Sequence, residues 1–240
     1  MSAVTKFDLI ILGSGSTAFA AALRAQELGK TALMTEERSV GGTCVNRGCL
    51  PSKNLIEAAK LVYDAKNPRY PGLKPATLEI DFPQLVQQKD DVIAGYRKKK
   101  YESLLGGKFR IEEGHAQFVD PRTVEIAGRK FTGDVLLIAT GARPVLPDIH
   151  GLSDVPYLTS DLLTSGENVE LKRLPKSLLV VGGGYIALEL GQMFRRFGVA
   201  VTIVERSDEL LRYGYEPEVG PTVRQVFQEE GIEVLTRAPW

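Results

Sequence analysis

The sequence has 240 residues, of which 43% are hydrophobic and 25% charged. This composition is typical of a soluble globular protein of one to two domains and excludes disordered, collagen-like and coiled-coil chains. Its 30 basic and 30 acidic side chains balance, so no basic excess would attract nucleic acid or an acidic membrane. No apolar run approaches the roughly 20 residues of a membrane span, and the N-terminus lacks the apolar core of a secretory signal, so we expect a cytoplasmic protein.

The chain begins with the pattern of a βαβ unit. Phe7–Leu12 is a nearly continuous apolar run, typical of a strand that is buried on both faces. The glycine-rich turn Gly13–Ala18 follows, and Phe19–Leu28 has strong helix propensity. A second apolar strand is expected at Thr31–Thr35, with Glu36 at its end.

The middle of the chain changes its periodicity several times. Gly41–Tyr63 runs from glycines and cysteines into a helical pattern, and Phe82–Leu105 predicts a long amphipathic helix, whose Lys98–Lys100 run we interpret as a solvated face. Phe109–Thr132 alternates apolar and polar residues, which predicts small antiparallel strands. Val135–Ala139 is another wholly apolar strand.

The opening pattern then returns after a proline-containing loop. A strand is expected at Ser177–Val181, a glycine turn at Gly182–Ala187, a helix at Leu188–Phe197 and a strand at Val199–Val204, which Glu205 ends. A further helix (Glu216–Glu230) and strand (Ile232–Leu235) extend this second unit. The sequence therefore predicts an α/β fold with two Rossmann-like, doubly wound parallel sheets of three layers, the second incomplete. We expect domains at 1–150 and 151–240.

Each glycine turn has the features of a dinucleotide site. A glycine-rich turn between strand and helix lets the backbone approach a pyrophosphate at the helix N-terminus. Ala18 and Ala187 are small enough for close packing of helix on strand, and Glu36 and Glu205 are placed to accept hydrogen bonds from ribose hydroxyls. Ordinary tight turns in an α/β sheet are the alternative interpretation.

Cys44 and Cys49 are the only two cysteines, with four residues between them. This is not a secreted disulfide scaffold, and zinc would need more ligands, since His115 and His150 lie far away in the sequence. Two buried apolar cysteines are one interpretation. The other is a redox dithiol near the start of a helix, where the dipole favours a thiolate that attacks a disulfide, binds a soft metal or donates electrons to a flavin.

Four motifs resemble those of the pyridine nucleotide-disulfide oxidoreductases, and the resemblance covers nearly the whole chain. These motifs are Gly13–Ala18, Gly41–Lys53, Ala139–Pro144 and Gly182–Glu189. Within the family the chain is most similar to mercuric reductases, on Gly13–Leu23, Lys100–Gly107 and Pro156–Ser160. The resemblance implies FAD in the first unit, NAD(P)H in the second, and transfer of hydride to the flavin and then to a Cys44–Cys49 disulfide.

The resemblance also implies roles for individual residues. Cys49 would lie against the flavin as the charge-transfer thiol, and Cys44 would exchange with the substrate. Lys53 would sit near the flavin ring, paired with Glu189, and Tyr185 would gate the nicotinamide pocket. Contacts to the cofactors are expected from Gly13, Gly15, Ser16, Thr17, Ala18, Glu36, Gly42, Thr43, Lys53, Ala116, Thr140, Gly141, Gly182, Gly184, Tyr185, Ile186, Glu189, Glu205 and Arg206. His115 is expected to be structural.

The choice between NADH and NADPH stays open. Glu205 should accept from a free 2′-hydroxyl and repel a 2′-phosphate, which favours NADH. Arg206 could instead hold that phosphate, and the resemblance to mercuric reductases implies NADPH.

Because chains of this family are roughly twice as long, the resemblance implies that a C-terminal dimerisation domain is absent from this sequence and that the full-length enzyme is a homodimer. The favoured function is reduction of Hg(II) to Hg(0), with Cys44 and Cys49 as transient Hg(II) ligands. A reductase of lipoamide or another organic disulfide is the second hypothesis, and an inactive dinucleotide-binding fragment is the third.

Overall fold

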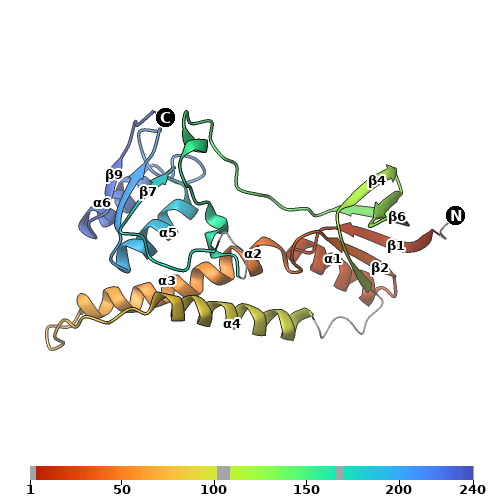
Figure 1. The fold of residues 1–240 in the computed structure, drawn as a ribbon, viewed down its shortest axis with the longest axis horizontal. Coiled ribbons are helices and arrows are strands. Elements are labelled where there is room, and N and C mark those ends of the chain that lie inside the picture. The colour runs from red at the N-terminus through yellow and green to blue at the C-terminus, as the bar shows by residue number, and fades with distance from the viewer. Residues whose placement is uncertain (1–3, 102–108, 166–169, 240) are drawn as a thin grey trace. The chain divides into compact units, whose positions relative to one another are not determined.

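The computed structural model describes residues 4–101, 109–165 and 170–239, and the chain divides into two compact units (Figure 1). The first unit comprises residues 1–51 and 91–145, and the second comprises residues 52–90 and 146–240. Residues 52–90 therefore pack with the second unit, although the expected boundary at residue 150 assigned them to the first. The reason is apolar packing, since side chains of this segment share one core cluster with the second glycine-turn helix.

A six-stranded sheet organises the first unit. Its strand order is β3-β2-β1-β6-β5-β4. The strands are β1 (Thr5–Leu12), β2 (Ala32–Glu36), β3 (Phe109–Glu113), β4 (Ala116–Asp120), β5 (Thr123–Ile126) and β6 (Arg129–Ile138). Strands β3, β2, β1 and β6 are parallel neighbours, whereas β4 and β5 pair antiparallel. The four parallel strands confirm the Rossmann-like prediction.

Strand β1 is buried on both faces, as its apolar run predicts. Ile11 packs with Ala18 and Phe19 of helix α1 (Ser16–Glu27), while Ile10 and Leu12 pack on the opposite face of the sheet. Successive side chains of a strand point to opposite faces, so one apolar run supplies both layers. Figure 1 shows α1 beside β1 and β2.

Two sequence predictions in this unit need correction. The stretch 109–132 was predicted to form antiparallel strands, but β3 pairs parallel with β2, and only the residues after Gly114 pair antiparallel. The strand expected at Val135–Ala139 overlaps the second half of the longer β6, which ends at Ile138. Strand β6 pairs parallel with β1 and antiparallel with β5, an arrangement that periodicity alone does not encode.

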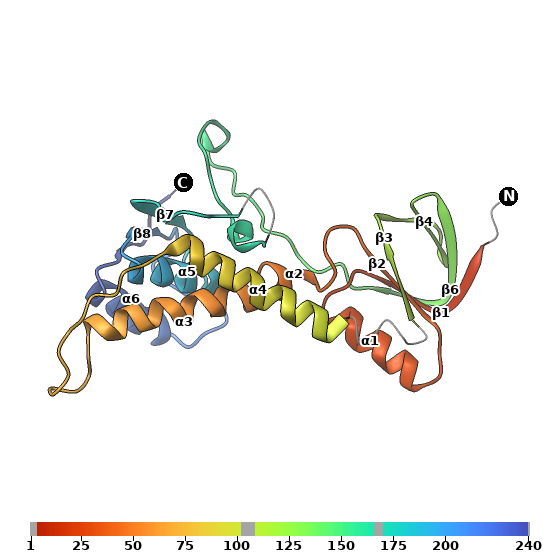
Figure 2. The same cartoon turned by 60° about the horizontal axis from the view of Figure 1, so that its bottom comes forward.

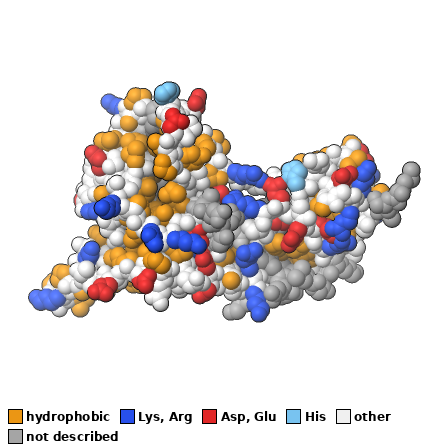
Figure 3. Space-filling model, viewed as in Figure 1, with side chains coloured by type: hydrophobic (Ala, Val, Ile, Leu, Met, Phe, Trp, Pro, Cys, Tyr) orange, Lys and Arg blue, Asp and Glu red, His pale blue; other side chains and the backbone are white. Residues whose placement is uncertain are grey.

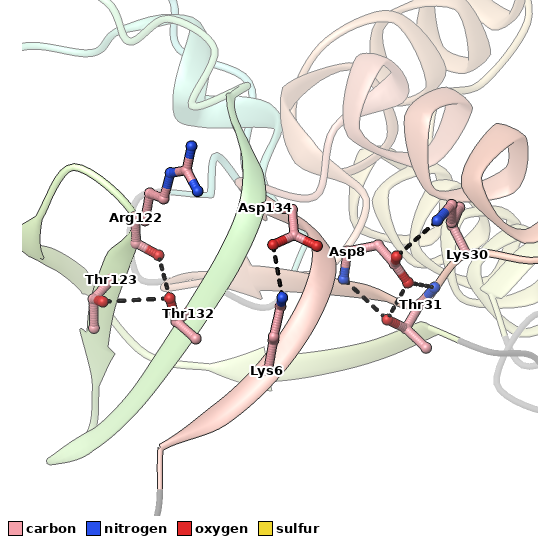
Figure 4. A network of polar contacts seen from close by, with 8 residues as sticks. All are labelled: Lys6, Asp8, Lys30, Thr31, Arg122, Thr123, Thr132 and Asp134. Atoms are coloured by element: carbon pink, nitrogen blue, oxygen red, sulfur yellow. Dashed lines mark hydrogen bonds and ion pairs between the residues drawn. The ribbon is translucent and has the colours of Figure 1, made fainter.

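A polar network ties the first part of β1 to the residues before β2 (Figure 4). Asp8 accepts hydrogen bonds from the Thr31 amide at 2.8 Å, the Thr31 hydroxyl at 2.7 Å and Lys30 Nζ at 3.0 Å. The Thr31 backbone bond is the largest cause that lowers the pKa of Asp8, followed by the Thr31 hydroxyl and Lys30. Lys6 and Asp134 form an ion pair of 2.9 Å between β1 and β6.

Helices α2, α3 and α4 occupy the part of the chain between β2 and β3. Helix α2 spans Gly42–Asn46, α3 spans Cys49–Lys66 and α4 spans Phe82–Tyr101. The segment 41–63, which was expected to run from glycines and cysteines into a helical pattern, contains α2 and the start of α3 with a break between them. The end of the predicted helix at Leu105 and most of the segment Lys100–Gly107 lie outside the described residues.

The second unit contains a three-stranded parallel sheet in the order β7-β8-β9. Its elements are β7 (Ser177–Val181), α5 (Tyr185–Arg196), β8 (Ala200–Val204), α6 (Val219–Glu229) and β9 (Glu233–Leu235), preceded by two short 3-10 helices at Leu152–Asp154 and Ser160–Leu163. Phe82 of α4 meets Phe197 edge-on, with ring centroids 5.8 Å apart. Figure 2 shows α3 and α4 running side by side.

One side of the β7-β8-β9 sheet forms the core, and side chains on the other side are accessible. Leu178 and Val180 of β7 pack on the core cluster, whereas Leu179 is 62% exposed and Val181 is also exposed. Figure 3 shows hydrophobic side chains at the surface of this unit. Among the residues that the structure describes, no helix is both long and apolar enough to cross a bilayer.

Candidate functional site

A cleft of about 640 Å³ opens in the first unit, at the carboxyl ends of β1, β2, β3 and β6. Ligands of open α/β sheets bind at this edge. The sequence-predicted residues in its lining are Gly13, Gly15, Ser16, Thr17, Glu36, Gly42, Thr43, Cys44, Ala116, Thr140 and Gly141. The fold thus brings together eleven of the predicted site residues, which come from five segments of the chain. Ala18 is fully buried in the core beside β1, where it packs helix on strand.

The turn after β1 brings three backbone segments close together. Gly13 has φ +108°, and a Cβ added there would overlap the carbonyl of Ala139, whose carbon would be 2.9 Å away. Gly42 has φ +68°, and its added Cβ would lie 2.6 Å from Cα of Gly15. Both positions therefore need glycine, because of the backbone angle and because no room is left. An added Cβ at Gly15 meets nothing within 4 Å, so this residue faces open space.

Ser14, which the sequence analysis did not select, connects this turn to two other segments. Its hydroxyl donates to Glu36 Oε2 at 2.5 Å and accepts from the Gly41 amide at 3.1 Å. The second oxygen of Glu36 accepts from the Arg38 amide at 2.9 Å. Glu36 is thereby held at the cleft by hydrogen bonds on both oxygens.

Three charged or ionisable side chains that follow strand ends lie together in the cleft lining. Glu37 pairs with His115 Nδ1 at 2.5 Å and accepts from the Arg143 guanidinium. The hydrogen bond from His115 is the largest cause that lowers the pKa of Glu37, and the charge of Arg143 lowers it further. His115, which was expected to be structural, lies in the cleft lining. It follows Gly114 after the end of β3, on the sheet edge where ligands bind, and this position is the sequence signal for its place in the lining.

The segment that carries the cysteines is held by Asn46. This side chain is almost fully buried, and its Nδ2 donates to the carbonyls of Ser39 at 3.2 Å, Val40 at 3.1 Å and Gly42 at 2.9 Å. Cys44 lies within α2 and lines the cleft, and Cys49 is the first residue of α3. Both cysteines are exposed.

Lys53 and Glu189 belong to the second unit, where Lys53 Nζ lies 2.5 Å from Glu189 Oε1. Their side chains are 57% and 42% exposed. An ion pair this accessible contributes little to stability. The predicted pairing of Lys53 with Glu189 is present.

The second glycine turn repeats the first with different atoms. Gly182 has φ +103°, and the Gly183 amide donates to Glu205 Oε2 at 2.6 Å. Glu205 Oε1 accepts from the Ser207 amide at 2.7 Å. Burial raises the pKa of Glu205, but the hydrogen bonds from Ser207 and Gly183 and the charge of Arg206 together lower it below its usual value.

The start of α5 is open to a ligand. An added Cβ at Gly184 meets nothing within 4 Å, and Tyr185 and Ile186 are exposed in the first turn of the helix. Arg206 is exposed directly after Glu205. Within the described ranges, no three histidine, cysteine or acidic side chains gather as a metal site.

These features fit the two nucleotides that the sequence predicts. The volume of the first cleft lies inside the roughly 300–1,000 Å³ range of small-molecule and cofactor sites. Its glycine turn leads into α1, whose first amides have no partner inside the helix and can bind phosphate. The turn of the second unit leads into α5 in the same way, with an ionised acid beside it.

Comparisons with known proteins agree with this arrangement. The family model described as pyridine nucleotide-disulphide oxidoreductase matches residues 7–239. The chain is 42% identical to the mercuric reductase of Lysinibacillus sphaericus over 233 residues, which are 97% of this chain and 42% of that protein. It is 34% identical to the dihydrolipoyl dehydrogenase of Geobacillus stearothermophilus over 236 residues, which are 96% of this chain and 48% of that protein.

Among solved structures, the HOCl-induced flavoprotein disulfide reductase RclA from Escherichia coli superposes with a TM-score of 0.82 at 27% identity. The match covers 97% of this chain and 49% of RclA. The chain therefore spans about half the length, or less, of the relatives that it matches. The matches to the family model and to the relatives cover nearly the whole sequence and confirm the predicted resemblance. The chain therefore belongs to the pyridine nucleotide-disulphide oxidoreductase family, whose members use FAD and NAD(P)H.

Proposed function

We propose that this chain supplies the FAD site, the NAD(P)H site and the redox-active cysteines of an oxidoreductase that reduces Hg(II) to Hg(0). The observation that carries the proposal is that Cys44 lines the same cleft as the first glycine turn and Glu36. The identity of 42% to a mercuric reductase, against 34% to a dihydrolipoyl dehydrogenase, supports Hg(II) as the substrate. The activity is proposed for a protein that contains this chain, since the chain spans only 42% of that mercuric reductase.

In this proposal the first unit holds FAD. The amides at the start of α1 bind the pyrophosphate, and Gly15 leaves its backbone accessible to it. Glu36 accepts a hydrogen bond from a ribose hydroxyl, and Thr43, Ala116, Thr140 and Gly141 contact the cofactor largely through their backbone. When bound, FAD takes up and releases the electrons that pass between the nicotinamide and the cysteines.

The second unit holds NAD(P)H in the same way. The N-terminus of α5 binds the pyrophosphate, and Glu205, fixed by two amides, accepts from the adenosine ribose. Tyr185 is exposed in the first turn of α5, which leaves its ring able to cover the nicotinamide pocket. Lys53 and Glu189 are proposed as catalytic residues that act as an ion pair, since they meet at 2.5 Å.

The cysteines complete the electron path. We assign Cys49 to the flavin side and Cys44 to exchange with the substrate. Thiolates are soft ligands that suit a soft metal ion such as Hg(II), so both cysteines can bind the substrate transiently. One NAD(P)H supplies two electrons, which are sufficient to convert one disulfide into two thiols or one Hg(II) into Hg(0). By resemblance to the family, the protein that contains this chain acts as a homodimer.

The test is to purify the protein that contains this chain with added FAD, record flavin absorbance, and follow NAD(P)H oxidation with thiol-complexed Hg(II) or with lipoamide as acceptor. We expect bound flavin and faster oxidation with Hg(II). Cys44→Ser and Cys49→Ser should each abolish the Hg(II)-dependent rate, whereas Ser153→Ala, at an exposed position of the second unit, should not change it. Flavin binding without turnover of either acceptor would leave only a nucleotide-binding chain.

A disulfide reductase is the second candidate. The relatives that favour it are the dihydrolipoyl dehydrogenase, 34% identical, and the flavoprotein disulfide reductase RclA, 27% identical. Faster oxidation of NAD(P)H with lipoamide than with Hg(II) in the same assay would select this candidate. The cysteine variants would then lose the lipoamide-dependent rate instead.

A further inference from the structure

We propose that Ser14 is a positioning residue that fixes the ribose-binding carboxylate of Glu36 and the cysteine-bearing segment relative to each other. This inference rests on the proposed FAD site. Ser14 lies between the two glycines of the first turn, two residues after the end of β1, and is 1% exposed. All the groups that it touches belong to the first unit.

The hydroxyl of Ser14 bridges two segments that are otherwise separate. It donates to Glu36 Oε2 at 2.5 Å, at the end of β2, and accepts from the Gly41 amide at 3.1 Å, directly before α2. Glu36 and Gly41 are thus both bonded to one buried oxygen. Gly42, the next residue, approaches Gly15 so closely that an added Cβ would lie 2.6 Å from its Cα.

The roles of the hydroxyl are fixed by its chemistry. A serine hydroxyl has one proton to donate and two lone pairs that accept. The Gly41 amide can only donate, so the serine proton is directed to the carboxylate, which can only accept when ionised. This arrangement aligns both bonds, and a bond to an ionised acceptor is stronger than one between neutral groups.

The hydrogen bonds of Ser14 link the proposed ribose-binding residue to the segment that carries Cys44. Glu36 is the residue proposed to hold the flavin ribose, and Cys44 lies three residues after Gly41 in the segment that Asn46 fastens to the carbonyls of Ser39, Val40 and Gly42. Removing the hydroxyl would leave one oxygen of the partly buried Glu36 and the amide of the buried Gly41 without this partner. The carboxylate could then turn away from the ribose, and Gly41 would lose its attachment to the turn.

A residue that only fills space would behave differently. Ser14→Ala keeps most of the volume and removes both hydrogen bonds, Ser14→Thr keeps the hydroxyl, and Ser14→Cys keeps the shape with a weak donor. If Ser14 acts through Glu36, the effect of Ser14→Ala on FAD affinity should shrink in a Glu36→Gln background, because coupled residues are not additive. Space filling predicts additive effects.

The experiment measures the FAD dissociation constant of the wild-type chain and of the Ser14 variants, alone and with Glu36→Gln, together with the thermal melting of each apo chain. Loss of the buried hydrogen bonds should weaken FAD binding by roughly 10- to 100-fold in Ser14→Ala. Ser14→Thr should stay close to wild type, and the control Ser153→Ala should be unchanged. Ser14→Cys, which should fall between Ser14→Ala and wild type, replaces Ser14→Ala if the alanine variant does not fold.

A second readout reports on the cysteine segment. In a Cys49→Ser background Cys44 is the remaining cysteine, so its rate of reaction with a thiol reagent at saturating FAD measures how firmly the segment is held. We expect this rate to rise when Ser14→Ala is added. Wild-type affinity for FAD in Ser14→Ala, or additivity with Glu36→Gln, would overturn the proposal while the FAD site itself stood. Absence of FAD binding by the wild-type chain would overturn both.

Discussion

Both glycine turns hold an acidic side chain by hydrogen bonds to both of its oxygens, but they use different donor atoms. In each turn, the acid at the end of the second strand accepts a hydrogen bond from the backbone amide two residues later. Glu36 accepts from Arg38 at 2.9 Å, and Glu205 accepts from Ser207 at 2.7 Å. The other carboxylate oxygen is bonded to the residue after the first glycine. In the first turn this donor is the side chain of Ser14, and in the second it is the backbone amide of Gly183.

The difference follows from what surrounds each turn. A Cβ on Gly183 would lie 2.7 Å from Leu210 Cδ2 and 3.0 Å from Glu205 Oε2, so the acid and a buried leucine fill the space that a side chain would need. In the first turn the corresponding space holds the Ser14 hydroxyl, which also reaches the Gly41 amide. The first turn therefore holds its acid through a side chain, whereas the second holds its acid through the backbone amide of Gly183, whose carbonyl also accepts from the Leu211 amide at 3.1 Å.

The largest expected effect comes from the first glycine of each turn. Gly13→Ala combines an unfavourable backbone angle with an overlap against the Ala139 carbonyl, whereas Gly182→Ala has an equally unfavourable φ of +103° but nothing within 4 Å of the added atom. We expect Gly13→Ala to cost about 3 kcal/mol or more and Gly182→Ala about 1–3 kcal/mol. Urea unfolding monitored by circular dichroism measures both, and equal losses would show that backbone angle alone controls the two turns.

The second prediction introduces into the second turn the serine that the first turn has at position 14. In Gly183→Ser, the new Cβ must displace either Leu210, which is 1% exposed, or Glu205. We expect a loss of about 1–3 kcal/mol in stability and weaker NAD(P)H binding, measured by urea unfolding and by fluorescence titration. A stable Gly183→Ser chain with unchanged nucleotide affinity would contradict the view that the second turn has no room for a side chain.

Spacing alone predicted the turns, because each requires glycine after a buried strand and an acid at the end of the next one. This pattern predicts Gly13, Glu36, Gly182 and Glu205 as site residues without knowledge of any contact. Ser14 could not be predicted in the same way, because a serine in a glycine-rich turn is ordinary, and its hydroxyl bonds Glu36 and Gly41, which lie 22 and 27 residues away.

The sequence did not predict that Glu37, His115 and Arg143 meet in the cleft lining. For a related reason, it did not predict which unit the helical residues of 52–90 pack with. Glu37 meets His115 and Arg143 across 78 and 106 residues, and no periodicity reports on such a distance. The amphipathic residues of 52–90 indicated that these helices would bury one face, but not which of the two units would receive it. Local pattern determines elements and turns, whereas the choice of partner depends on the packing of the whole chain.

A third prediction concerns the acids themselves. Glu36 is followed by another acid and Glu205 by Arg206, so only the second turn places a cation next to its acid. Because hydrogen bonds lower the pKa of Glu205, it stays ionised through the neutral range and should repel a 2′-phosphate. We expect NADH to bind more tightly than NADPH, and Glu205→Gln to shift the ratio of their dissociation constants about tenfold towards NADPH.

Fluorescence titration of both nucleotides measures this ratio, with Glu216→Gln, at an exposed acid of the same unit, as the control. The wild-type ratio should stay constant between about pH 7.5 and 8.5, because a carboxylate with a lowered pKa does not titrate there and the 2′-phosphate, whose second pKa is about 6, is already fully ionised. Tighter binding of NADPH by the wild-type chain would show that Arg206 outweighs the acid.

The smallest expected effect lies towards the start of β1 in the first unit. There the side chain of Asp8 joins β1 to Thr31 and Lys30 (Figure 4), in addition to a backbone bond of 3.1 Å from Leu9 to Thr31. The second unit has the corresponding backbone bond, also of 3.1 Å, from Ala200 to Lys176. Since the pKa of Asp8 is lower in the folded chain than in the unfolded one, its contribution to stability is complete above the usual aspartate range and is lost as the pH falls towards the folded value. Asp8→Asn should therefore be slightly less stable than wild type at pH 6, and urea unfolding should show this difference shrinking as the pH is lowered below about 4. A difference that stays constant down to the acid limit would mean that Asp8 acts through its shape and neutral hydrogen bonds, as the backbone does in the second unit.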